Sequence, residues 1–341
     1  MKIVTITDIK TLVARHTFKQ FILDLISYIK EDFKNWHDFD KSPRHVIHVD
    51  GGVEELMPVA NKKFYTYKYV NGHPKNTKAD KFTIVATGQI ATVDDGYPLM
   101  YTEMTLLTAF RTAATSAIAT ELMSRKESTV LGLIGTGAQS EFQVLANILV
   151  RNITKVKYFD IDASAMAKFA KNIQKHNLNI ELIACKNHEE AVVNSDIIIS
   201  CIAEKGHVNA VMNAWVKPGA HLNGIGGDCP GKTELELPLL SRAKIVVEYL
   251  PQSSVEGEIQ MLSAKEIDSL VQAELWELIS GNKTVRTSDE DITLFDSVGF
   301  ALEDFSVLRL VYDLSEKYNL GHDLDMIPNI SDTKNLISLL G

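Results

Sequence analysis

The chain of 341 residues carries 35 basic and 44 acidic side chains, which gives a formal charge of −9 at pH 7. A net acidic protein repels phosphate backbones, so nucleic acid is excluded as an expected partner. The hydrophobic fraction of 45% is typical of a globular protein, and a chain of this length is expected to form two domains.

The first third of the chain predicts a mixture of helices and strands. Apolar residues recur at helical spacing from Phe18 to Ile29, which predicts a helix over residues 17–33. A run rich in alanine and threonine predicts a long helix over residues 106–123. The strands predicted between these helices cover residues 46–49, 56–60, 64–70, 82–92 and 98–103.

Strands and helices alternate from about residue 128 onward. The predicted strands are residues 129–134, 155–159, 180–184, 196–202, 221–225 and 244–248. Helices are predicted over residues 139–150 and 164–176, with a short one from Glu189. Such alternation predicts a parallel sheet with helices on both faces, the doubly wound Rossmann arrangement.

The alternating pattern stops around residues 293–297, and a last helix is predicted over residues 301–318. This helix is expected to return to the first domain. The fold class is therefore predicted as α/β, with a Rossmann domain over residues 116–299. A discontinuous α+β domain is expected from residues 1–115 and 300–341.

A glycine-rich run follows the first strand of the alternating region. It reads Gly-Thr-Gly-Ala-Gln-Ser over residues 135–140, directly before a predicted helix. Gly135 would allow a tight turn, and Gly137 would let a pyrophosphate approach the backbone at the helix N-terminus. Asp160 ends the next strand, where a carboxylate binds ribose hydroxyls and repels a 2′-phosphate. The pattern predicts NAD rather than NADP.

Two alternatives to this cofactor site remain open. Asp162 could take the place of Asp160 as the ribose-binding acid. The glycines could also form an ordinary turn between a strand and a helix, which is common in α/β proteins.

A second glycine-rich segment, residues 224–235, follows a later strand of the same region and contains Asp228. Ligands gather at the carboxyl ends of parallel strands, so Asp228 is expected near the cofactor. The alternative is a glycine-rich turn in which Asp228 caps the next helix.

Three cations of the first domain, Arg44, Lys68 and Arg111, lie on predicted strands or helices. They could converge on a substrate carboxylate, although each by itself is more typical of a solvated surface charge. Glu55 has the same ordinary explanation. No histidine pair has metal-ligand spacing beside a carboxylate, so no metal is predicted.

The location of the protein is expected to be cytoplasmic. Its three cysteines, Cys185, Cys201 and Cys229, form no CxxC pair and suggest a reducing compartment. No apolar run has membrane-spanning length, and the first residues lack the apolar core of a signal peptide.

Taken together, these motifs resemble the ornithine cyclodeaminase and mu-crystallin family over nearly the whole chain. The resemblance rests on residues 51–58 (GGVEELMP), 68–76 (KYVNGHPKN), 135–139 (GTGAQ), 226–235 (GGDCPGKTEL) and 294–300 (LFDSVGF). Ser140 stands at the third glycine position, as the family allows. Cys201 departs from the pattern, because a hydroxyl-bearing residue is common there.

The resemblance implies a role for each candidate residue. Arg44, Lys68 and Arg111 would hold an amino acid carboxylate, Glu55 would meet a distal amine, and Val298 would lie beside the substrate. Asp228 would be the acid and base. The residues implied to bind NAD, besides Gly135 and Gly137, are Thr83, Arg111, Ala138, Gln139, Asp160, Lys232 and Ser297.

The activity implied is the conversion of L-ornithine to L-proline and ammonia by internal hydride transfer through a tightly bound, recycled NAD. A homodimer joined through the first domain is also implied. The nearest alternatives are an NAD(P)-dependent amino acid dehydrogenase, a ketimine reductase and a lysine cyclodeaminase. A non-catalytic binding protein like mu-crystallin is the alternative from another class.

Overall fold

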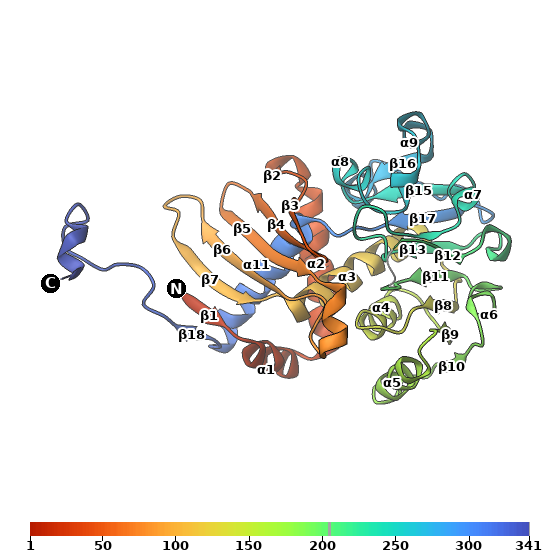
Figure 1. Cartoon of the computed structure of the whole chain (residues 1–341), viewed down its shortest axis with the longest axis horizontal. Coiled ribbons are helices and arrows are strands. Elements are labelled where there is room, and N and C mark those ends of the chain that lie inside the picture. Colours follow the sequence, from red (N-terminus) through yellow and green to blue (C-terminus); the bar gives the residue numbers. More distant parts are fainter. Residues whose placement is uncertain (204–205, 341) are drawn as a thin grey trace.

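The computed structural model describes residues 1–203 and 206–340. Two β-sheets lie side by side along the long axis of the molecule, each with its own helices (Figure 1). None of the helices in the described part of the chain is long and apolar enough to cross a membrane.

The first sheet has the strand order β18-β1-β7-β6-β5-β4-β2, and β3 pairs with β4. Its pairs are antiparallel except for β1 with β7. The strands are β1 Lys2–Val4, β2 Asp40–Lys41, β3 His45–Val49, β4 Gly52–Ala60, β5 Phe64–Gly72, β6 Ala86–Thr92, β7 Pro98–Glu103 and β18 His322–Asp323.

Helices cover only one face of this sheet, as the alternating burial of β5 indicates. Phe64, Lys68 and Val70 are buried, whereas Tyr65 and Tyr69 are exposed on the other face. The helices of this body are α1 Ile6–His16, α2 Phe18–Lys34, α3 Thr105–Met123 and α11 Ala301–Tyr318.

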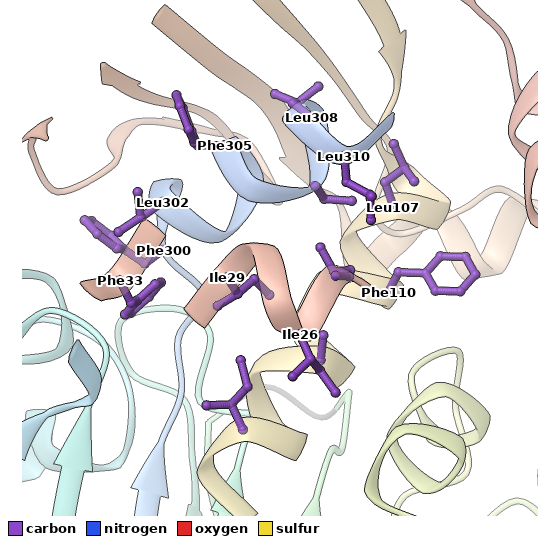
Figure 2. Close-up of a cluster of buried hydrophobic side chains, with 14 of the residues drawn as sticks. Ile26, Ile29, Phe33, Leu107, Phe110, Phe300, Leu302, Phe305, Leu308 and Leu310 are labelled. Atoms are coloured by element: carbon purple, nitrogen blue, oxygen red, sulfur yellow. The ribbon is translucent and has the colours of Figure 1, made fainter. Parts of the chain in front are cut away.

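The helix α11 comes from the far end of the chain and packs against α2 and β5. Figure 2 shows Phe305 and Leu308 on α11, Ile29 on α2 and Phe110 on α3, which all belong to one hydrophobic cluster. The division into residues 1–115 with 300–341 and residues 116–299 stays a prediction. Its boundary at residue 115 falls inside α3, which runs unbroken from Thr105 to Met123.

The second sheet has the order β10-β9-β8-β11-β13-β17-β15-β16, and all of its pairs are parallel. Its strands are β8 Val130–Ile134, β9 Lys155–Phe159, β10 Glu181–Ala184, β11 Ile197–Ser200, β13 His221–Gly224, β15 Ala243–Val247, β16 Val271–Glu274 and β17 Ile292–Asp296. A small separate sheet pairs β12 His207–Val211 with β14 Thr233–Leu235.

Hydrophobic clusters lie on both faces of the second sheet. Ile197 and Ile199 of β11 belong to one cluster, and Ile198 between them belongs to another. Its helices are α4 Ser140–Asn147, α5 Ala163–Gln174, α6 His188–Val192, α7 Leu237–Leu240, α8 Leu250–Ser253, α9 Ala264–Leu270 and α10 Leu275–Ile279. The molecule is thus an α/β protein with a Rossmann-type doubly wound sheet beside an α+β body.

Two details of the sequence prediction were wrong. The pattern was expected to stop at residues 293–297, yet β17 is a fully buried strand inside the second sheet. The polar residues Thr293 and Asp296 make this strand hard to recognise in the sequence. In the fold, both side chains form hydrogen bonds with other buried groups of the chain. The strand predicted from residue 82 begins only at Ala86, because β6 pairs with β5 no further than Val70.

Candidate active site

Four parallel strands of the second sheet end in one row. Ile134, Ser200, Gly224 and Asp296 are register partners at the carboxyl ends of β8, β11, β13 and β17. The segments that follow these residues therefore emerge at the same edge of the sheet, where doubly wound folds bind ligands. Both glycine-rich segments predicted from the sequence are among them.

The segment after β8 has an open backbone at its tip. Gly135 adopts φ +89°, and a Cβ there would lie 2.7 Å from the carbonyl oxygen of Cys201. A Cβ on the exposed Gly137 would meet nothing within 4 Å. The loop directly precedes α4, so its amides and open approach fit the pyrophosphate of a dinucleotide.

The two acidic candidates after β9 have different partners. Asp160 accepts hydrogen bonds from the Thr136 backbone nitrogen at 2.6 Å and from the Thr136 hydroxyl at 3.1 Å. It therefore lies against the glycine-rich loop. Asp162 instead caps α5 by accepting from the Ser164 nitrogen at 2.8 Å. The geometry thus brings Asp160, and not Asp162, to the loop.

Cys201 also lies against this loop. Its thiol donates to the Gly135 carbonyl at 3.3 Å, and burial raises the pKa of the thiol. The neutral thiol therefore stabilises the turn at Gly135 through this hydrogen bond.

Asp228 lies on the segment after β13 with its side chain 43% exposed. It accepts a hydrogen bond from the Lys232 ammonium at 3.0 Å. The alternative that Asp228 caps a helix is wrong, because the next element is β14 and the following helix begins at Leu237. Burial lowers the pKa of Lys232, but the charges of Asp228 and Glu234 outweigh that effect and leave it raised.

The three first-body cations are buried and not solvated. The side chains of Arg44, Lys68 and Arg111 are 7%, 1% and 7% exposed. The surface-charge explanation is therefore wrong for all three. Each has one or more carboxylate partners, which partly repay the desolvation of a buried charge.

Lys68 and Arg111 are held by the first turns of α11. The Lys68 ammonium donates to Asp304 at 2.9 Å, and Arg111 donates to Glu303 at 2.6 Å and approaches Asp304 at 3.2 Å. Burial, together with the charge of Arg111, lowers the pKa of Lys68 to about 8, against the attraction of Asp304.

Arg44 connects the two bodies of the molecule. Its guanidinium donates to Glu55 at 3.1 Å and to the carbonyls of Val298 and Gly299 at 2.6 and 2.7 Å. Its Nε lies 3.5 Å from a carboxylate oxygen of Glu256. Gly299, with φ +78°, leaves no room for a side chain, because a Cβ would overlap the Arg111 guanidinium.

Four acidic residues around these cations were not predicted as site residues from the sequence: Glu248, Glu256, Glu303 and Asp304. Burial raises the pKa of Glu256 to about 7, against the attraction of Arg44, and that of Glu303 to about 8, against Arg111. The position of Glu303 and Asp304 at the start of a predicted helix was an available signal, since acidic residues favour helix N-termini. Nothing comparable marked Glu256.

Glu248 shapes the segment after β17. It accepts hydrogen bonds from the Ser297 hydroxyl at 2.5 Å and from the nitrogens of Val298 and Gly299 at 3.0 and 3.1 Å. Val298 is buried beside Arg44. Thr83 lies further away in sequence, half-buried in the loop before β6, where its carbonyl accepts from the His73 nitrogen at 2.8 Å.

The remaining cofactor candidates lie at the start of α4. Ala138 is exposed beside Gly137, and Gln139 occupies the N-cap position of the helix. The side-chain oxygen of Gln139 is buried and makes no hydrogen bond within the described residues. A buried acceptor without a partner is a group that a ligand could satisfy.

Comparison with known proteins identifies the family. The model of the ornithine cyclodeaminase/mu-crystallin family matches residues 7–319. An ornithine cyclodeaminase of Agrobacterium fabrum is 44% identical over 337 residues, which cover 99% of this chain and 94% of that protein.

Two solved structures are similar over nearly their full lengths. A lysine cyclodeaminase, studied for its recognition of L-lysine, L-ornithine and L-2,4-diaminobutyric acid, has a TM-score of 0.91, 26% identity and coverage of 99% of both chains. An archaeal alanine dehydrogenase dimer with bound NAD has a TM-score of 0.88 and 31% identity, and it covers 96% of this chain and 99% of its own. The chain belongs to the ornithine cyclodeaminase/mu-crystallin family.

Proposed function

We propose that the protein is an ornithine cyclodeaminase that converts L-ornithine to L-proline and ammonia with a bound, recycled NAD. The observation that carries the proposal is the set of carboxylates around Arg44. Glu55 and Glu256 flank its guanidinium, and against the effect of burial the charges of Glu256, Glu55 and Asp228 raise the pKa of Arg44. Three carboxylates around one arginine suit a substrate with two ammonium groups. The 44% identity to a curated ornithine cyclodeaminase supports the same activity.

NAD would bind along the carboxyl edge of the second sheet. Gly135, Gly137 and the amides before α4 would hold the pyrophosphate, and Asp160 would accept from a ribose hydroxyl. The other residues proposed to contact it are Thr83, Arg111, Ala138, Gln139, Lys232 and Ser297. When bound, NAD supplies a nicotinamide that takes a hydride from the substrate and later returns it.

The buried cations would bind the α-carboxylate of the substrate. Arg44 and Arg111 offer planar donor groups, and Lys68 adds a compact charge. All three already have protein carboxylates as partners, so the substrate replaces or joins existing ion pairs. The segment containing Val298 would form the wall beside the substrate, because its backbone is fixed by Arg44 and Glu248.

Glu55 and Glu256 would bind the distal ammonium. Both side chains are at least nine-tenths buried, so their charges are poorly screened by water and attract a second ammonium strongly. This feature favours a diamino acid over alanine, whose side chain has no charge. It does not separate ornithine from lysine, since one methylene changes binding by only about 1–3 kcal/mol.

Asp228 would move the protons at the α-nitrogen. Its half-exposed side chain can accept a proton from the α-ammonium and return it when ammonia leaves. The Lys232 ammonium donates a hydrogen bond to this carboxylate at 3.0 Å and so orients it. Ornithine as a cation yields neutral proline and an ammonium ion, so no net proton is exchanged with solvent.

We also propose that the protein is a cytoplasmic homodimer joined through the uncovered face of the first sheet. Ile47, Leu56, Tyr65 and Tyr69 expose 67%, 40%, 39% and 40% of their areas there. Apolar side chains gathered on one sheet face mark an interaction surface. The similar archaeal alanine dehydrogenase is a dimer.

The experiment is to incubate the purified protein with L-ornithine and catalytic NAD while following ammonia, proline and NADH absorbance. Cyclodeamination predicts equal ammonia and proline without NADH accumulation. NADH that accumulates in step with turnover would make the protein a net dehydrogenase and contradict the proposal. If NAD binds but no reaction follows, L-lysine and L-alanine are the next substrates, and failure with all three would leave a binding protein.

A further inference from the structure

The chain ends in a segment that leaves the body of the molecule. We name residues 324–340 the C-terminal arm. It begins where β18 pairs with β1, with Asp323 opposite Lys2, and the Leu324 nitrogen donates to the Met1 carbonyl at 2.9 Å. Beyond Leu324, the hydrogen bonds of the described residues join the arm only to itself. Figure 1 shows it extending away from both sheets to the C-terminus.

The arm carries apolar side chains that no part of the described chain covers. Met326, Leu336, Ile337 and Leu340 are 63%, 60%, 72% and 82% exposed. Leu336, Ile337 and Leu340 lie in the 3₁₀ helix η5 Leu336–Leu340. A five-residue helix is not stable by itself in water, so it needs a surface to pack against.

Three observations point to a second copy of this chain as that surface. The arm starts at the edge of the same sheet whose uncovered face carries Ile47, Leu56, Tyr65 and Tyr69. It points away from the second body of its own chain (Figure 1). Its 17 residues could reach roughly 55 Å when extended, which is enough to cross a neighbouring subunit.

The arm lies outside the family model but within the alignments to two similar proteins. The family model ends at residue 319, before the arm. The structural likeness to the lysine cyclodeaminase covers 99% of this chain, and the alignment with the Agrobacterium fabrum relative also covers 99%. Both therefore extend into the arm.

We propose that the C-terminal arm docks on a second copy of this chain and buries Leu336, Ile337 and Leu340 against it. The inference rests on the proposed homodimer, and it adds an interface outside the sheet face. Each subunit then contributes one arm to the other, because a twofold dimer exchanges the same contacts in both directions.

The test compares the full chain with Ile337→Asp/Leu340→Asp and with the matched control Lys334→Asp, which reverses a charge at an exposed polar position of the arm. Sedimentation equilibrium gives the dimer dissociation constant for each. We expect the double variant to raise it at least tenfold, since two apolar contacts are lost, and the control to change it less than threefold. Hydrogen exchange of the arm is measured above and below the dissociation constant of the full chain.

The expected result is an arm protected from exchange in the dimer and unprotected after dilution. Protection that persists in the monomer would mean that the arm docks on its own chain, which contradicts the proposal. If the double variant has an unchanged dissociation constant and the arm stays unprotected in the dimer, the proposed docking of the arm is wrong and the proposed homodimer stands. A full chain that is monomeric at every concentration would overturn both.

Discussion

The proposed cofactor side and the proposed substrate side of the site are built in different ways. The cofactor side is local in sequence: the glycine-rich loop of residues 135–140 and Asp160 come from two consecutive strands. The substrate side gathers Arg44, Lys68 and Arg111 from a loop, a strand and a helix of the first body, and it adds Glu256 from the second.

The two sides also differ in their electrostatics. Gly137 and Ala138 are exposed, so the tip of the loop on the cofactor side presents its backbone at an open surface. On the substrate side, all three cations are buried in ion pairs with protein carboxylates. Backbone geometry therefore forms the proposed cofactor site, whereas the proposed substrate site depends on a network of buried ion pairs.

The largest expected effect comes from replacing Asp228 with Asn, which should impair turnover of the substrate and leave NAD binding intact. The amide cannot accept the α-ammonium proton, so kcat with ornithine should fall by about 10³-fold. NAD affinity, measured by calorimetry, should stay within about twofold of the native value. Asp162→Asn is the matched control, because Asp162 only caps α5, and its kcat should be unchanged. An active Asp228→Asn enzyme would remove Asp228 as the base.

Lys68→Met tests the buried network. Asp304 loses its partner at 2.9 Å, so the free energy of unfolding in urea should fall by about 3 kcal/mol. The kcat/KM for ornithine should fall by about 10²-fold, since a buried charge contact with the substrate carboxylate is lost. The exposed Lys63→Met is the control and should change neither quantity. Native stability in Lys68→Met would show that Arg111 alone satisfies Asp304.

Two variants that each add one methyl group test how the loop on the cofactor side works. Gly137→Ala meets nothing within 4 Å, so Tm should not change, but NAD affinity should fall about tenfold where the methyl blocks the pyrophosphate. Gly135→Ala should lower Tm, because φ +89° and the Cys201 carbonyl at 2.7 Å leave no room for the methyl. Equal NAD affinity in Gly137→Ala would place the pyrophosphate elsewhere.

The smallest expected effect is the pH dependence of kcat/KM for ornithine. Burial lowers the pKa of Lys68 to about 8, so the ammonium that holds the carboxylate is lost as pH rises through that value. Burial raises the pKa of Glu256 to about 7, so the carboxylate for the distal amine is lost as pH falls through that value. Each group is about half in its active form at its own pKa, so activity should be about halved by each group there and fall further beyond it. In Glu256→Gln the acid limb should disappear and the alkaline limb remain.

The sequence predicted much of the second sheet, because alternating strands and helices have strong periodicity. It missed β16 and β17, and in β17 the polar Thr293 and Asp296 break an otherwise apolar pattern. On the cofactor side it identified the loop and both acids, and the structure distinguished Asp160 from Asp162 by their hydrogen bonds.

By itself, the sequence determined the doubly wound sheet, the glycine-rich loop and the identities of the three cations, because these depend on local pattern and residue type. Only the tertiary structure decided that Arg44, Lys68 and Arg111 are buried and which carboxylates they meet. Residues as far apart as Arg44 and Glu256 come into contact through the packing of two bodies. Ion pairs between distant segments leave no periodicity in the chain, so their partners are set by the fold alone.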